Sequence, residues 1–171
     1  MSAKVDSVVS IRKYKPSDKE ACRSLWRELT EWHRDLYADP SIGGKHPEVF
    51  FDKHLKKVGP GKIWVAVKGA QVVGFAGLVV GDEEAELEPI VVAKEHRGQG
   101  IGRRLVEAVV SEAESMGVRF LNVRPVARNA SAIRYFAGRG FNKVGRVELF
   151  IDYTGTKWKK GLRMHDTEFQ H

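Results

Sequence analysis

The fold of this chain is decided by one stretch, Val91-Val92-Ala93-Lys94-Glu95-His96-Arg97-Gly98-Gln99-Gly100-Ile101-Gly102-Arg103-Arg104-Leu105. It begins in an apolar run that predicts the end of a buried strand, and it continues through a polar turn into a glycine-rich segment. From Ile101 onward, apolar residues recur at helical spacing. The stretch therefore predicts a strand, a glycine loop and a helix in direct succession.

The glycine loop has the features of a phosphate-binding site. Gly98, Gly100 and Gly102 lack the Cβ atoms that would keep a ligand away from the backbone. The first N–H groups of a helix have no partner within the helix, and the helix dipole adds partial positive charge there. Full charges suited to phosphate oxygens come from Arg97, Arg103 and Arg104. Neither the dinucleotide fingerprint nor the P-loop pattern fits these spacings.

Two motifs resemble those of one enzyme superfamily. The pattern R-x-x-G-x-G from Arg97 to Gly102 resembles the acyl-CoA pyrophosphate loop of the GNAT (Gcn5-related N-acetyltransferase) superfamily. The segment from Asn129 to Phe141 is similar to its second motif, N-x-x-A-x-x-x-Y followed by G-F. One departure is that Phe136 stands at the tyrosine position, with Tyr135 one residue earlier.

The resemblance implies a GNAT acyl-CoA N-acyltransferase fold of the α+β (mixed α/β) class, in a single domain over residues 1–171. Its central sheet is expected to be mixed and strongly twisted, with six to seven strands flanked by about four helices. Periodicity predicts strands over residues 8–14, 63–67, 71–80, 85–92, 118–123, 141–151 and 162–169, and helices over 16–37, 47–57, 101–116 and 129–139. Pro89 predicts a bulge in its strand, and Gly74 and Gly77 predict a close backbone approach.

The resemblance also implies acetyl-CoA as the acyl donor and no metal. The backbone of the strand before the loop would pair with the pantetheine arm, and the loop N–H groups would hold the pyrophosphate. The expected cofactor-binding residues are Ile90, Val91, Val92, Arg97, Gly98, Gln99, Gly100, Ile101, Gly102, Arg103, Asn129, Ala132 and Phe136.

The expected chemistry is direct attack of an amine on the thioester. A nearby carboxylate would take the amine proton, directly or through water. Glu86 and Glu88 share one face, because they are two residues apart on a predicted strand. The resemblance implies Glu88 as the first candidate for this base, with Glu86 as the close second. The alternative is that both are solvated edge carboxylates. Tyr135 is the candidate proton donor to the leaving thiolate, and its alternative role is packing. Water, another side chain or direct loss of the CoA thiolate are the alternatives to a tyrosine donor.

The acceptor is expected to be a primary amine: a polyamine-like or amino-sugar amine, or a protein N-terminus or lysine. The resemblance places the acceptor pocket along residues 26–51. A cluster of acidic residues would attract a cationic acceptor, or would only solubilise a hairpin; its members are Asp82, Glu83, Glu84, Glu86 and Glu88.

Composition limits the remaining function classes. The polar segment Met1–Asp6 lacks a signal region, which favours a cytoplasmic protein, and no membrane partner is expected. Cys22, the only cysteine, is expected to be a buried packing residue. The net charge of +7 suits a polyanionic cofactor and also leaves open a basic nucleic-acid-binding protein, which the motifs disfavour. A second alternative is a catalytically silent acyl-CoA sensor of the same fold, and a homodimer is compatible with the resemblance.

Overall fold

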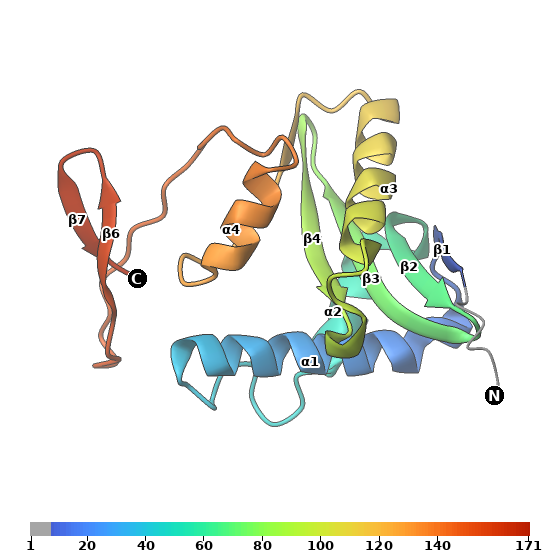
Figure 1. Ribbon diagram of the computed structural model, residues 1–171, viewed down its shortest axis with the longest axis horizontal. Coiled ribbons are helices and arrows are strands. Elements are labelled where there is room, and N and C mark those ends of the chain that lie inside the picture. Colours follow the sequence, from blue (N-terminus) through green and yellow to red (C-terminus); the bar gives the residue numbers. More distant parts are fainter. Residues whose placement is uncertain (1–7) are drawn as a thin grey trace, which may run out of the picture. The chain divides into compact units, whose positions relative to one another are not determined.

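The computed structural model describes residues 8–171, which divide into two compact units at Arg124 and Pro125 (Figure 1). The polar segment Met1–Asp6, on which the expectation of a cytoplasmic protein rests, lies outside the described residues. Within the described part of the chain, no helix combines the length and the apolar character needed to span a membrane.

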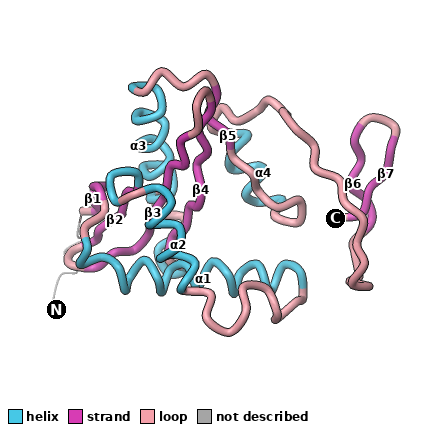
Figure 2. The backbone as a smooth tube through the Cα atoms, turned by 180° about the vertical axis from the view of Figure 1, so that it is seen from behind, coloured by secondary structure: helices cyan, strands magenta, loops and turns pink. Residues whose placement is uncertain are grey.

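The first unit is built on a mixed sheet of five strands in the order β1-β2-β3-β4-β5 (Figure 2). The first three neighbouring pairs are antiparallel, and β4 and β5 are parallel. The strands are β1 (Val9–Lys13), β2 (Ile63–Lys68), β3 (Gln71–Val80), β4 (Glu84–Val92) and β5 (Phe120–Asn122). The sequences of the central strands β2 and β3 are nearly continuous apolar runs, because both faces of these strands are covered.

Three helices cover this sheet: α1 (Lys19–Tyr37), α2 (Val49–Val58) and α3 (Ile101–Ser115). Short 3-10 turns lie at Pro16–Asp18, Pro60–Lys62 and Lys94–His96. On one face, Val65 and Phe75 join buried residues of α1 and α2 in a single core. On the other face, Lys13 lies over the ring of Trp64 and forms an ion pair at 3.0 Å with Glu112 of α3. The adjacent β2 residues Trp64 and Val65 therefore point to opposite faces of the sheet.

The core between α1, α2 and the sheet is aromatic. The ring of Phe75 lies 5.4 Å from that of Phe51 and 6.3 Å from that of Trp26. Cys22 is fully buried beside this cluster, and burial raises the pKa of its thiol to about 12. It is therefore a packing residue, as the sequence predicts, and not a nucleophile.

The second unit contains α4 (Ala130–Ala137) and a separate hairpin of β6 (Lys160–Met164) and β7 (Thr167–Gln170). The prediction of a strand over residues 141–151 is wrong, because these residues form no regular element. The predicted strand over 162–169 is instead a hairpin, whose turn interrupts that segment. The fold class is confirmed, but the central sheet has five strands and not six to seven. A strand needs a neighbouring ladder, and the apolar residues of 141–151 have none here.

We predict that replacing the fully buried Phe75 with alanine lowers the free energy of unfolding by about 3–5 kcal/mol, because it leaves a cavity among the aromatic rings. Urea unfolding followed by tryptophan fluorescence measures this change. The control is Val80→Ala at the partly exposed end of the same strand. Equal losses for the two variants would contradict the assigned core.

Candidate active site

The candidate site begins where β4 and β5 separate. The parallel ladder joins only Glu84–Glu86 to Phe120–Asn122, whereas β4 continues to Val92. Beyond Glu86, the edge of β4 is thus no longer paired with β5, and its backbone groups can hydrogen-bond an extended ligand in the manner of an added strand.

A bulge in β4 lies within this segment. Ala76 pairs with Ile90 and Leu78 with Leu87, so that Gly77 alone faces the two residues Glu88 and Pro89, which are joined by a cis peptide bond. This confirms the bulge predicted from Pro89. The close approach at Gly77 is also confirmed, because a Cβ there would lie 2.4 Å from the carbonyl oxygen of Glu88 and 2.5 Å from Nε2 of His54.

The predicted close approach at Gly74 has a different neighbour. A Cβ at this residue would lie 2.8 Å from the carbonyl oxygen of Val91. Both glycines in β3 therefore allow β4 to lie against it, one beside the bulge and the other at the end of β4.

Glu84, Glu86 and Glu88 alternate with the buried Ala85 and Leu87, so that the three carboxylates share one face of β4. Each has a partner of opposite charge or a donor amide. Asn122 donates to Glu84 at 3.0 Å, Arg124 forms an ion pair with Glu86, and Lys57 of α2 lies 4.0 Å from a carboxylate oxygen of Glu88. Two of these three contacts therefore bring a positive charge to a carboxylate of the predicted acidic cluster.

The two candidate bases differ in their surroundings. The side chain of Glu86 is only 15 % exposed, and one of its oxygens is occupied by the guanidinium of Arg124. The side chain of Glu88 is 48 % exposed, and its ion pair among the described residues is the 4.0 Å contact to Lys57. Glu88 therefore has the more accessible carboxylate of the two.

The glycine loop leads directly from β4 into α3. Gly98 and Gly100 have φ values of +76° and +77°, in the left-handed region that favours glycine, and a Cβ on either would meet open space. Gly100 is the N-cap of α3, and its carbonyl accepts from Arg104 N at 3.2 Å. The N–H groups of Ile101, Gly102 and Arg103 thus begin the helix without intrahelical acceptors. This geometry can bind an anion.

The three arginines of the loop have different roles. Arg97 donates to the carbonyl oxygen of Val92 at 2.9 Å and forms an ion pair with Glu28 of α1 at 2.8 Å. Arg104 donates to the carbonyl oxygen of Val9. Arg103 is exposed and has only a 3.6 Å ion pair with Glu107 one turn along the helix. Arg103 can turn toward an anion at small cost, whereas Arg97 must exchange existing contacts.

The residues of the second motif belong to the second unit. Oδ1 of Asn129 accepts from the backbone N–H of Ala132 at 3.0 Å, so the N-x-x-A spacing is that of an N-cap and the third residue of a helix. Phe136 is buried, with its ring 5.6 Å from that of Phe141 and 5.2 Å from that of Tyr135. The guanidinium of Arg139 lies over the Tyr135 ring. The functional roles of Asn129, Ala132, Tyr135 and Phe136 stay predictions.

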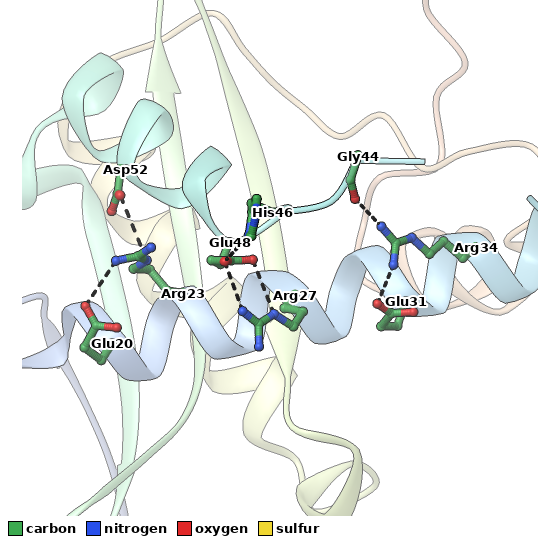
Figure 3. A network of polar contacts seen from close by, with 9 residues as sticks. All are labelled: Glu20, Arg23, Arg27, Glu31, Arg34, Gly44, His46, Glu48 and Asp52. Atoms are coloured by element: carbon green, nitrogen blue, oxygen red, sulfur yellow. Dashed lines mark hydrogen bonds and ion pairs between the residues drawn. The ribbon is translucent and has the colours of Figure 1, made fainter. Parts of the chain in front are cut away.

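The loop between α1 and α2, where the acceptor pocket is expected, is held by ion pairs along α1 (Figure 3). Arg34 donates to the carbonyl oxygens of Ile42 and Gly44 at 2.9 and 2.6 Å, and it also contacts Glu31. Arg27 forms an ion pair with Glu48 at 3.0 Å. These contacts to backbone and side chains fix the path of the loop relative to α1.

Sequence reasoning missed two residues next to the site. Glu28 joins α1 to the glycine loop through Arg97. His54 is buried, and its Nε2 lies against Gly77 at the bulge. The only local signal for His54 is its place on the buried stripe of α2, three residues after Phe51. The contacts of both residues join segments that are distant in the sequence.

Comparisons with known proteins define the class to which this fold and site belong. A model of the acetyltransferase (GNAT) family matches residues 25–141, which is more than half of the chain. The chain therefore belongs to the GNAT acetyltransferase family.

Two curated relatives and one solved structure illustrate this membership. The chain is 40% identical over 99 residues to N-acetyltransferase family 8 member 2 of Rattus norvegicus, covering 53% of this chain and 43% of the relative. It is 36% identical over 76 residues to a ribosomal protein-alanine N-acetyltransferase of Escherichia coli, covering 44% and 51%. The chain thus spans about half or less of these relatives. An aminoglycoside N-acetyltransferase solved with CoA has a TM-score of 0.64 at 18% identity, covering 88% of this chain and 99% of that one, and it shows the shared fold.

We predict that Gly77→Ala lowers the free energy of unfolding by about 1–3 kcal/mol, because the added methyl group meets a backbone carbonyl and a buried imidazole. The control is Gly61→Ala, since a Cβ at Gly61 meets open space; there we expect a change within about 1 kcal/mol. Chemical denaturation of both variants measures the difference. A Gly77→Ala variant as stable as the parent would contradict the close approach.

Proposed function

We propose that this protein is an acetyl-CoA-dependent N-acetyltransferase that transfers the acetyl group directly to a primary amine. One observation carries the proposal: the edge of β4 that leaves β5 leads, through one short 3-10 turn, into the glycine loop and the start of α3. A ligand that is extended at one end and carries phosphates at the other matches this sequence of sites. Acetyl-CoA has this construction.

In this proposal the backbone of Ile90, Val91 and Val92 pairs with the pantetheine arm. The pyrophosphate is bound by N–H groups from Gly98 through Gly102, including those of Gln99 and Ile101. The absence of side-chain atoms around Gly98 and Gly100 supports this fit, as does the exposed Arg103 on the first turn of α3. Arg97 contributes by holding the loop against Val92 and α1.

The proposed reaction has a simple balance of bonds. The neutral amine attacks the thioester carbonyl, a carbon–nitrogen bond forms, and the carbon–sulfur bond breaks to release the CoA thiolate. The carboxylate of Glu88 takes the amine proton, directly or through one water, and Glu86 is the alternative base. A backbone N–H of the β4 segment after the bulge stabilises the tetrahedral oxyanion. Tyr135 is retained as the candidate proton donor to the thiolate.

The acceptor that we propose is a cationic primary amine of a small molecule or of a protein N-terminus. Support comes from the three carboxylates on one face of β4 and from the relatives that act on a ribosomal protein alanine and on aminoglycosides. The full chain is proposed to act as one acetyltransferase domain, and we propose that it does so in the cytoplasm without a metal.

We predict that Gly100→Glu weakens CoA binding tenfold or more, about 1.4 kcal/mol, because a carboxylate is placed where the pyrophosphate is expected. The matched control is Gly117→Glu at the opposite end of α3, where φ is +69° and the backbone strain is similar. Isothermal titration calorimetry measures both affinities. Equal affinities of the two variants would refute the loop as the phosphate site.

We predict that release of free thiol from acetyl-CoA accelerates with one class of amine in a panel of polyamines, aminoglycosides, amino acids and N-terminal peptides. With that acceptor, Glu88→Gln should lower kcat by about 100-fold at neutral pH, as expected for loss of a general base. Glu86→Gln should have a smaller effect because Glu86 is held by Arg124. Tight CoA binding without transfer to any amine would favour the sensor alternative, and salt-sensitive DNA or RNA binding would favour the nucleic-acid alternative.

A further inference from the structure

His54 of α2 is an unusual buried residue. Its side chain is only 5% exposed, and its Nε2 has no hydrogen-bond partner among the described residues. Buried polar atoms are normally paired, because an unpaired one loses its hydration without compensation. The position of this nitrogen therefore calls for a functional explanation.

The imidazole is held in place by the aromatic core. Its ring centroid lies 5.6 Å from that of Trp26, which also packs on Phe75 and Phe51. Burial lowers the pKa of His54, and the charge of Lys57 acts in the same direction while that of Glu88 opposes it. The ring is thus neutral near pH 7, with one nitrogen that donates and one that accepts.

Nε2 is directed at the bulge of β4. The Cβ position of Gly77 lies 2.5 Å from Nε2 and 2.4 Å from the carbonyl oxygen of Glu88, so both atoms border the same small space. No side chain intervenes, because residue 77 is glycine. The carbonyl oxygen of the candidate base is therefore an acceptor that an N–H at Nε2 can reach if this space closes.

Helix α2 contacts Glu88 in two places. His54 lies beside its backbone carbonyl, and Lys57, three residues further along the same helix, lies 4.0 Å from its carboxylate. The backbone of a residue in the middle of a bulge lies outside the regular ladder of hydrogen bonds. The ladder therefore does little to fix the direction of the side chain. Helix α2 can hold Glu88 at two points, at the backbone carbonyl through His54 and at the carboxylate through Lys57.

We propose that His54 is a positioning residue for acetyl transfer: its Nε2–H binds the carbonyl oxygen of Glu88 and holds the bulge so that the Glu88 carboxylate faces the acceptor amine. This inference rests on the proposed function for its catalytic consequence. The two atoms are not bonded in this structure, and the hydrogen bond forms as cofactor and acceptor fill the site, since catalytic contacts are often loose in the free enzyme. The same contact gives Gly77 its role, because a side chain there would separate the two atoms.

The first test is independent of turnover. In the full chain labelled with nitrogen-15, the ring shifts of His54 between pH 6 and 8 should show the neutral tautomer protonated at Nε2. Saturation with CoA should move the Nε2 proton resonance downfield, as expected when this hydrogen bond forms. Protonation at Nδ1 instead would overturn the proposal, because Nε2 could not donate. Failure of CoA to bind would refute the proposed function separately.

The second test uses two variants that differ in one donor. His54→Phe fills the space without a polar atom, whereas His54→Gln places an amide N–H close to the original Nε2. We expect His54→Phe to lower kcat about tenfold through misalignment of Glu88, with KM for acetyl-CoA within about twofold. His54→Gln should recover most of this loss. Amide hydrogen exchange of Glu88 and Ile90 should rise in the Phe variant and return to the parent rate in the Gln variant.

Three outcomes would overturn the positioning role. One is a Phe variant with the parent kcat and unchanged exchange at the bulge. Another is a Gln variant as slow as the Phe variant although both unfold at the same denaturant concentration. The third is a loss confined to KM for acetyl-CoA, which would place the effect at the cofactor and not at the base.

Discussion

The structure depends on one interruption of backbone pairing, the place where Gly77 of β3 faces both Glu88 and Pro89 of β4. The extra residue reverses the alternation of β4. Val91 pairs with Phe75 and enters the core with α1 and α2, whereas Leu87 pairs with Leu78, three residues from Phe75 and thus on the other face of β3. Because of this reversal, Glu86 before the bulge and Glu88 within it face the same side as the buried Val91 after it.

In the same region, β4 is paired along one edge and unpaired along the other. The ladder between β3 and β4 resumes at Ile90, while the ladder between β4 and β5 ends at Glu86. Backbone groups after the bulge are therefore held on one side by β3 and directed on the other toward the space that β5 leaves. Beyond this edge, Arg97 ties the loop before α3 to Val92 and to Glu28 of α1. The glycine loop and the first helix are thus directly connected.

Much of this arrangement could be predicted from local patterns. The strand, glycine loop and helix around Gly100 lie where the sequence places them, and Pro89 and Gly77 mark the bulge. The strand expected over residues 141–151 failed for a physical reason. Its apolar, β-branched composition favours an extended chain, but such a chain becomes a strand only when another strand accepts its hydrogen bonds. In the second unit, β6 and β7 pair with each other.

By itself, the sequence determined the features that depend on neighbours a few residues apart: helical periodicity, the glycines with positive φ at the start of α3, and the proline that breaks a ladder. Only the tertiary structure decided the contacts between distant segments. Examples are His54 beside the carbonyl of Glu88, Arg124 on Glu86, and Glu28 on Arg97. Conformational preferences are local properties of the chain, whereas the partner of a buried nitrogen or an ion pair depends on which elements the folded core brings together.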